Sequence, residues 1–242
     1  MRRAYYSCTN LLTCECGDNV TDLSYTYYNC RKLQNAVCGN NVTNLSSTYY
    51  YCTNLTTAVV GPNVTDMYSA YESCINLTAA VCGPLVKDMS RAYTECRNIK
   101  HGICGPNVNN MYSTYRYCFN LITGVIGPKV MDASQAFMSC NNLQILNIYN
   151  TSMSNYRNLV NVIGYVNNAI IQFNSTSSTA LTPSLTFNTF KQYINNATSS
   201  YRPCSRKMNA DVSNSIYWHN AQYNVTLQVA FLNYEEENNL TT

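Results

Sequence analysis

Cysteine and histidine are the residues of this chain whose chemistry could support catalysis or metal binding. The 242 residues include 13 Cys and 2 His. A thiolate beside an imidazole can act as a nucleophile, and thiolates in pairs can hold zinc or form disulfides. His101 stands three residues before Cys104, one residue separates Cys14 from Cys16, and His219 lies far along the chain. The spacing of the other cysteines decides between these chemistries.

Seven of the cysteines recur at a constant interval of 22 residues. They are Cys8, Cys30, Cys52, Cys74, Cys96, Cys118 and Cys140. Six full repeats therefore span residues 8–139, and a seventh begins at Cys140. A fixed period of about 20 to 29 residues with Leu at set positions is typical of a leucine-rich repeat solenoid, in which each turn of chain stacks on the previous one.

Other positions of the repeat are equally constant. Leu or Ile comes three residues after the Cys, Val comes twelve after it, and Leu, Met or Ala comes fifteen after it. Position nineteen is Tyr in five repeats and Phe in the sixth. Gly stands nine residues after the Cys, and Pro follows it in the last four full repeats, which predicts the end of a strand because Pro lacks an amide donor. Each apolar column is predicted to bury its side chains against their copies in neighbouring repeats.

A second set of cysteines lies eight residues after the first. It comprises Cys16, Cys38, Cys82 and Cys104, and Val60 and Ile126 take the same place in the other two repeats. Replacement by Val and Ile predicts a small apolar core position. An odd number of Cys and the absence of an apolar export signal at the N-terminus also favour reduced thiols over a disulfide framework. A disulfide framework and metal binding, for which Cys14 and Cys16 are the suggestive pair, stay as the alternatives.

Catalysis has little support in the sequence. His101 shares its position in the repeat with Thr, Asn and Ala, and Cys104 belongs to a predicted core column. One Asp or Asn per repeat follows the Val by two residues, at Asp22, Asn44, Asp66, Asp88, Asn110 and Asp132. A calcium ladder needs several carboxylates per ion, so these side chains are predicted to bond turn amides instead. No catalytic, cofactor-binding or metal-binding residue is predicted, and the protein is not expected to be an enzyme.

Composition narrows the choice of partners. Only 11% of residues are charged, against roughly 25% in ordinary soluble proteins, and the formal net charge is +3. No Lys/Arg cluster predicts a phosphate-binding face, so nucleic acid is not an expected partner. The most apolar late stretch, residues 159–173, is interrupted by Asn161, Asn167 and Asn168, so no membrane span is predicted.

The repeat wording C-x-N-L-x-x-A-V-C-G-P-x-V-x-D-M-x-x-A-Y resembles the BspA-like class of leucine-rich repeats over about residues 3–146. Two departures are a repeat one residue shorter than usual and a Gly where that family places its Pro. The resemblance implies a solenoid that is mainly β with short helical or irregular turns. It also implies binding rather than catalysis, since such repeats occur in surface adhesion and host-interaction proteins and in phage or virus particles.

The chain is predicted to contain two regions. Residues 1–148 form the solenoid, and residues 149–242 form a C-terminal β-containing domain that caps it or attaches it to a partner. Within the second region we predict a helix over residues 156–173. Near its end, Tyr223, Val225, Leu227, Val229 and Phe231 alternate with polar residues and Ala, the pattern of a half-buried strand.

The function predicted from these features is that of a non-enzymatic binding and structural protein. The leading hypothesis is a phage or virus particle component, such as a fibre, decoration or tail-associated protein, that contacts virion proteins or host surface molecules. The alternative is a bacterial or protist adhesin, located at the cell surface or secreted. No cofactor is expected, and assembly into a homo-oligomer is left open.

The candidate interaction surface is the position seven residues after each Cys. If positions three, six and eight point inward, position seven points out, which gives an apolar stripe of Val37, Val59, Val81, Ile103 and Val125. Thr56, Thr57, Thr78 and Thr123 border it. Two alternatives remain: these residues are merely good strand formers, or the alternation is reversed and the stripe belongs to the core.

Overall fold

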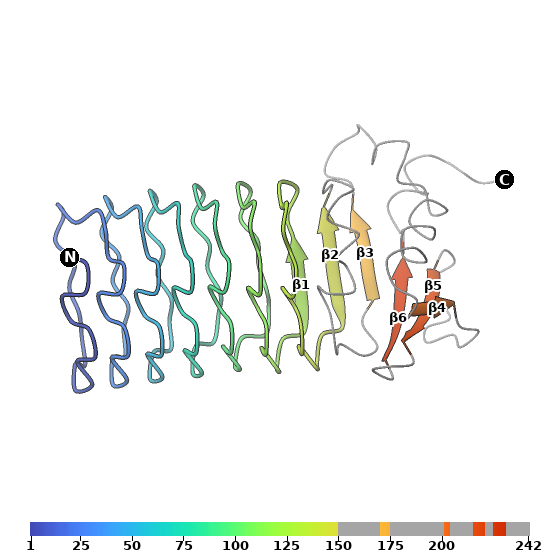
Figure 1. Cartoon of the computed structure of the whole chain (residues 1–242), viewed down its shortest axis with the longest axis horizontal. Helices are drawn as coiled ribbons and strands as arrows, with labels where there is room; N and C mark the ends of the chain where they lie inside the picture. Colours follow the sequence, from blue (N-terminus) through green and yellow to red (C-terminus); the bar gives the residue numbers. More distant parts are fainter. Residues whose placement is uncertain (150–169, 175–200, 204–214, 221–224, 231–242) are drawn as a thin grey trace.

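The computed structural model describes residues 1–149, 170–174, 201–203, 215–220 and 225–230. The 22-residue repeats form successive rungs of a solenoid, and the rungs lie side by side along the long axis of the molecule (Figure 1). The predicted leucine-rich repeat fold is therefore confirmed. Each rung has a strand side, which follows the repeat cysteine, and a turn side, which precedes the next one.

The regular strands lie toward the C-terminal end of the described chain and form one sheet. They are β1 (Thr123–Ile126), β2 (Ile145–Tyr149), β3 (Ile170–Asn174), β4 (Tyr201–Pro203), β5 (Ser215–Asn220) and β6 (Val225–Ala230), in the order β1-β2-β3-β6-β5-β4. The pairs β1–β2, β2–β3 and β3–β6 are parallel, and β6–β5 and β5–β4 are antiparallel. The parallel register of the solenoid thus extends beyond the seventh Cys.

Two predictions for the C-terminal region can be compared with these strands. The helix predicted over residues 156–173 is wrong for residues 170–173, which belong to β3, while residues 156–169 lie outside the described part. A run rich in Ile and Phe suits a parallel strand as well as a helix, and its pairing with β2 decides the outcome. The closing strand is confirmed for residues 225–230, and Tyr223 and Phe231 lie outside the described residues. The boundary at residue 148 and the capping role stay predictions.

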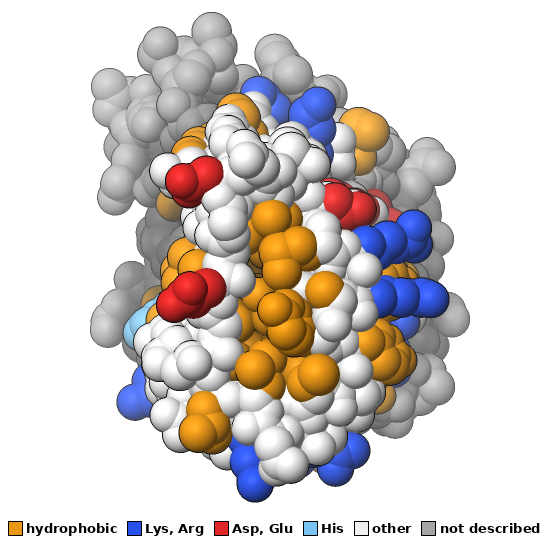
Figure 2. Space-filling view, turned by 90° about the vertical axis from the view of Figure 1, so that its left-hand side faces the viewer, with side chains coloured by type: hydrophobic (Ala, Val, Ile, Leu, Met, Phe, Trp, Pro, Cys, Tyr) orange, Lys and Arg blue, Asp and Glu red, His pale blue; other side chains and the backbone are white. Residues whose placement is uncertain are grey.

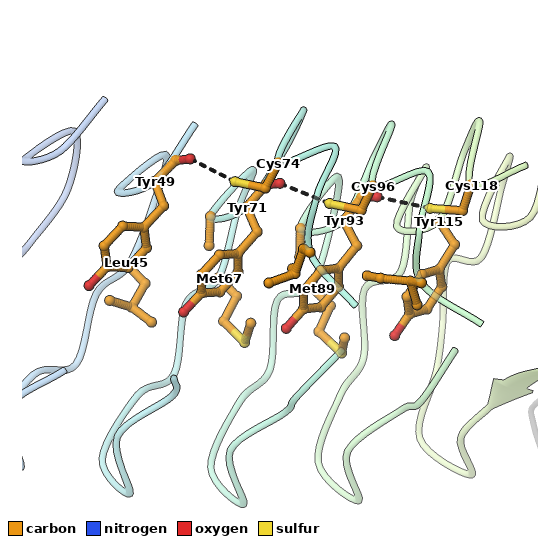
Figure 3. Packing of buried hydrophobic residues seen from close by; sticks show 14 of the residues in the cluster. Leu45, Tyr49, Met67, Tyr71, Cys74, Met89, Tyr93, Cys96, Tyr115 and Cys118 are labelled. Carbon is orange, nitrogen blue, oxygen red and sulfur yellow. Dashed lines mark hydrogen bonds between the residues drawn. The ribbon is translucent and has the colours of Figure 1, made fainter. Parts of the chain in front are cut away.

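The apolar columns form the core, as the repeat pattern predicts. The side chains at positions three, fifteen and nineteen of the interior rungs have no exposed surface, for example Leu55, Met67 and Tyr71. The rings of position nineteen stack with centroids 5.2 to 5.6 Å apart from Tyr27 through Phe137. Figure 3 shows these tyrosines in file with the buried methionines and cysteines beside them. Stacked aromatic pairs add to the burial of their surface, so each ring stabilises the next rung.

The turn side has no helix in the part of the chain that the structure describes. Alternate amides bond to the next rung, as when Tyr25, Tyr27 and Asn29 donate to carbonyls 2.9, 3.0 and 2.6 Å away. The intervening amides bond within their own rung, to the carbonyl three residues back, as Thr26 does. Two residues per rung have positive φ, such as Ser69 at 51°. Left-handed backbone costs an L-residue roughly 1 to 2 kcal/mol, so bonding in both directions must hold these turns in place.

The hydroxyl of each column tyrosine is bonded to the strand side of its own rung. Tyr71 accepts a hydrogen bond from the Val59 amide at 3.1 Å and donates one to the Val59 carbonyl at 2.5 Å. The same pair of hydrogen bonds recurs at Tyr49, Tyr93 and Tyr115 with the residue twelve positions earlier. The hydroxyl therefore takes the place of the neighbouring strand as partner of these backbone groups. We call this arrangement the tyrosine clamp.

The sixth repeat shows what happens without the clamp. Phe137 has no hydroxyl to offer Val125, and Val125 instead pairs with Asn147 in the parallel β1–β2 ladder. A Cβ at Gly124 would lie 2.5 Å from the Phe137 ring, so this strand runs close to the ring only because Gly has no side chain. The first regular strand of the chain thus coincides with the change from Tyr to Phe.

Removing one clamp hydroxyl should weaken the solenoid. In Tyr71→Phe, the amide and the carbonyl of Val59 lose their partners, and we expect the free energy of unfolding to fall by about 1 to 3 kcal/mol. Tyr5→Phe is the matched control, because no hydrogen bond of the Tyr5 hydroxyl is present in the described structure. This control should change the free energy of unfolding by less than about 0.5 kcal/mol. Urea unfolding of the full chain measures both. Equal effects would contradict the clamp.

The repeat-start cysteines from Cys30 onward are buried free thiols, as predicted for this column, whereas Cys8 is exposed. Cys30, Cys52, Cys74 and Cys96 have no exposed surface, and each is free. Each thiol donates to a tyrosine carbonyl of the previous rung, as Cys74 does to Tyr49 at 3.0 Å (Figure 3). Sulfur therefore serves here as a small buried side chain with a weak hydrogen bond between rungs.

The second cysteine column is less buried than predicted. Cys16, Cys38, Cys82 and Cys104 are half-buried, packed against the core rather than within it. They lie at the corner where the strand side ends, and the sulfur of each faces a glycine of the next rung. The Cys38 sulfur accepts a hydrogen bond from the Gly61 amide at 3.2 Å, and a Cβ at Gly61 would lie 3.0 Å from it. Glycine at this corner thus leaves room for the sulfur.

Alkaline pH should destabilise the solenoid through these buried acids. Burial raises the pKa of Cys30 and Cys82 to about 11 and holds the pKa of Tyr71 and Tyr93 well above its ordinary range. In the unfolded chain these groups release their protons at lower pH than in the folded chain. The unfolded state then binds fewer protons, so the free energy of unfolding falls as pH rises past about 9.

This pH dependence is measured by urea unfolding at pH 7 and pH 10. We expect a lower midpoint at pH 10, and a smaller drop in Cys82→Val, which removes one of these thiols and installs the residue that the chain itself carries at Val60. An unchanged midpoint at pH 10 would count against burial of these columns.

Candidate interaction surface

Position seven of the second to sixth repeats is at least partly exposed on the strand side. In β1 the burial alternates, with Thr123 and Val125 half-buried and Gly124 and Ile126 buried. Val37, Val81 and Ile103 are also half-buried, and Val59 is 38% exposed. This partial exposure is consistent with an outward stripe, while Val37 also packs against the core, so the orientation of the stripe stays a prediction. Its use as a contact surface stays a prediction.

The tyrosine clamp holds the backbone of the stripe from the interior of each rung. The backbone of Val37, Val59, Val81 and Ile103 is held at both its amide and its carbonyl by a fully buried tyrosine. A surface held in this way loses little conformational freedom on binding, which favours recognition of a partner.

The threonines border the stripe as expected, although not uniformly. Thr56, Thr57 and Thr78 are exposed, and the Thr78 hydroxyl donates to the Thr56 carbonyl at 3.2 Å. Thr123 is half-buried, and its hydroxyl lies 2.9 Å from Nδ1 of exposed His101. The strand side therefore combines an apolar row with hydroxyl groups beside it.

A hollow on the same side was not predicted from the sequence. It has a volume of about 660 Å³, and Asn98, Asn120, Asn142, Lys100 and Gln144 contribute to its lining. The side-chain amide of Asn142 donates to the Asn120 side chain at 3.4 Å. The sequence does contain a pattern that matches this hollow, because Asn stands two residues after the Cys in the last five repeats. Because this Asn belongs to the constant repeat pattern, its recurrence alone does not distinguish a surface feature from a structural one.

The Cys104–His101 pair that the sequence makes conceivable is not formed. His101 points its Nδ1 to Thr123, while the Cys104 thiol donates to the Gly105 carbonyl at 3.5 Å. Burial raises the pKa of Cys104 to about 12, which leaves little thiolate at neutral pH. Neither residue has the partner that nucleophilic catalysis requires.

The Asp and Asn column bonds turn amides, as predicted. Oδ1 of Asp22, Asp66, Asp88 and Asp132 accepts from the amide two residues later at 2.7 to 2.8 Å. Asp22, Asp66 and Asp88 line a second, smaller hollow of about 390 Å³ with Arg2 and Tyr68. Among the described residues there is no group of three or more His, Cys, Asp or Glu that could hold a metal ion. The column is thus part of the turn structure.

The fold and this surface agree with a family of repeat proteins. Residues 1–100 match the BspA type leucine-rich repeat region in six copies. This repeat region belongs to the BspA-type leucine-rich repeat family, whose members in general bind other proteins. No curated protein matches the chain.

Three solved structures are similar to the chain at low sequence identity. A leucine-rich repeat protein from Bacteroides ovatus shares 11% identity at a TM-score of 0.49, over 72% of this chain and 58% of that one. The leucine-rich repeat protein of T. pallidum shares 13% at 0.43, over 69% and 78%. A leucine-rich cell surface protein from Faecalibacterium prausnitzii shares 13% at 0.31, over 74% and 63%. Thus the chain spans less than two thirds of the first structure's length.

The described residues contain no helix that is both long and apolar enough to cross a bilayer.

Proposed function

We propose that this protein is a non-enzymatic, protein-binding module of the cell-surface adhesin type, and that its strand side is the contact surface. The observation that carries the proposal is the outward apolar stripe on a backbone fixed by the tyrosine clamp. The BspA-type repeat is consistent with this role. The hypothesis of a phage or virus particle component gains no support from the comparisons, so the adhesin alternative replaces it.

The physical character of the surface suits a protein partner. The stripe supplies apolar contact area at each rung, and the threonine hydroxyls beside it supply hydrogen bonds. Interfaces combine an apolar centre with a polar margin in this manner. Among the described residues that line the hollow on this side, Lys100 is the one charged side chain, so the hollow itself carries little charge. Recognition would then depend on shape and hydrogen bonding more than on charge.

Lysine substitutions in the stripe test the contact surface. Val59→Lys with Val81→Lys should leave the fold intact, because both side chains point outward, and should weaken binding at least about tenfold by placing charge in the apolar centre. The measurement is binding of the labelled chain to an array of purified extracellular proteins and to intact cells. Leu85→Lys is the control, since Leu85 is 45% exposed and lies at the corner after the strand side.

Three results would count against the proposal. Binding that survives in the double variant, binding that is lost equally in Leu85→Lys, or no binding of the unmodified chain to any array protein or cell would each contradict the strand side as contact surface. Circular dichroism and the melting temperature of each variant show whether the fold is retained.

Location in the source cells tests the adhesin class. We expect an antibody against the solenoid to label intact cells and the envelope fraction, since an adhesin must reach its partner outside the cell. Detection in purified phage or virus particles, with none at the cell surface, would restore the particle hypothesis and contradict the adhesin proposal.

A further inference from the structure

The hollow of about 660 Å³ on the strand side is lined by two rows of polar side chains from successive rungs. One row stands two positions after the repeat cysteine and consists of amides, at Asn98, Asn120 and Asn142. The other row stands four positions after the cysteine and includes Thr78, Lys100 and Gln144. We call this site the amide hollow. Its volume lies within the range of roughly 300 to 1,000 Å³ that is usual for small-ligand sites.

The amide hollow combines exposed polar groups with apolar surface. The side chains of both rows are exposed except for Ile122, which is half-buried, and buried Leu143 lies between the rows in the seventh repeat. Figure 2 looks along the solenoid and shows hydrophobic side chains gathered at the centre, with Lys and Arg side chains at the margin. The lining therefore offers hydrogen-bonding groups at the surface and apolar atoms toward the core.

The amides of the hollow have hydrogen-bonding capacity to spare. Among the described residues, the one side-chain hydrogen bond within the Asn row joins the Asn142 amide to the Asn120 oxygen, at 3.4 Å. The Lys100 ammonium has no hydrogen-bond partner in the described part of the chain. Each Asn side chain carries two N–H donors and one acceptor oxygen. Most of these groups are therefore available to a ligand.

The chemistry of these groups suits a neutral sugar. A sugar hydroxyl both donates and accepts hydrogen bonds, and so does an amide side chain. The C–H face of a sugar ring is apolar and can pack on Ile122. An apolar ligand would leave the amides unpaired, which costs free energy. A polyanion would require several cations, whereas Lys100 is the one charged side chain among the described residues of the lining.

The spacing of the rows fits a linear glycan. Neighbouring strands lie about 4.8 Å apart, so the hollow, whose lining runs from the fourth to the seventh repeat, spans about 14 Å. An extended chain of β-1,4-linked pyranose sugars advances by nearly one rung per sugar, so successive sugars meet equivalent amides. Alternate sugars in such a chain are turned over, and an amide can bond either edge because it is both donor and acceptor.

A peptide matches the same rows less well. An extended peptide advances by about 3.3 Å per residue, so its backbone groups fall out of step with the rungs when it lies along the solenoid. The interval between equivalent amides thus separates a glycan from a peptide as the occupant.

We propose that the amide hollow binds a neutral, linear, β-1,4-linked oligosaccharide, which lies along the solenoid with about three or four sugars in contact. This site uses positions two and four of the repeat, whereas the proposed protein contact uses position seven. The inference therefore does not depend on the proposed function. The two sites together would let the protein hold a glycan and a protein on the same side of the solenoid.

Isothermal titration of the full chain with defined tetrasaccharides tests the ligand class. The probes are cellotetraose, mannotetraose, xylotetraose and N-acetylchitotetraose, and we expect at least one to bind with a dissociation constant below about 1 mM. Maltotetraose has the same number of sugars, but its α-1,4 linkages coil the chain out of register with the rungs. It should bind at least about tenfold more weakly than the best of the four.

Substitutions in the Asn row locate the site. Asn120→Ala combined with Asn142→Ala should raise the dissociation constant of the best tetrasaccharide at least about tenfold, since each change removes hydrogen bonds to the ligand. Asn54→Ala is the matched control, because Asn54 is an exposed Asn at the same position of the third repeat and lies outside the hollow. It should change the dissociation constant by less than about twofold. Melting temperatures close to that of the unmodified chain show that the variants fold.

The stripe variant separates this inference from the proposed function. Val59→Lys with Val81→Lys should weaken protein binding and leave tetrasaccharide binding within about twofold of the unmodified chain. Loss of one activity without the other then shows which of the two sites has failed.

Several outcomes would overturn the glycan site. One is that none of the four probes binds with a dissociation constant below about 1 mM. Others are maltotetraose binding as tightly as the best of them, or equal loss of binding in Asn54→Ala and in the double Asn variant. Tighter binding of the acidic chain tetragalacturonate than of every neutral probe would indicate an anion site at Lys100 and would also contradict the proposal.

Discussion

A hydrogen bond between a buried tyrosine hydroxyl and the backbone of the opposite side of the same rung is the constraint on which this solenoid depends. Tyr71 spans the rung from turn side to strand side and satisfies both backbone groups of Val59. Its ring stacks on Tyr49 and Tyr93, so one residue joins the two sides of a rung and the rung to its neighbours. The side chain therefore fixes the thickness of the molecule. It also relieves the strand side of the need to form a continuous ladder.

The clamp has consequences for what the surface can do. Because the outward stripe is attached to clamped residues, its side chains project from a backbone that has few alternative conformations. The strand side can present a row of contacts without regular sheet pairing in the clamped rungs. Where Phe137 removes the hydroxyl, the chain changes to the ordinary parallel pairing of β1 with β2, and this pairing continues into β3. The hydroxyl oxygen of the column tyrosine thus decides whether the backbone at position seven bonds to a side chain or to a neighbouring strand.

The stacking also explains what the sides of the solenoid offer to a partner. Along the sides each rung meets the next, so backbone groups and rings of neighbouring rungs are paired with one another. Outward side chains then remain for contact with a partner.

The sequence by itself determined the period and the core columns. Identical residues at a fixed interval can be buried only against their own copies, so Leu55, Met67 and Tyr71 were recognisable as core without coordinates. The bonding of Asp66 and its equivalents to turn amides followed in the same way from their free exchange with Asn. A repeated local pattern carries this information because every rung places the same residue types in the same positions against its neighbours.

Only the tertiary structure decided the rest. The clamp could not be seen in the sequence, because a tyrosine in a core column gives no sign of which group its hydroxyl bonds. The strand at residues 170–173 was predicted as helix, because its partner β2 lies elsewhere in the chain. The half-burial of Cys82 depends on a glycine in the next rung. These features arise from contacts between residues at least twelve positions apart in the sequence, and residue types alone do not specify them.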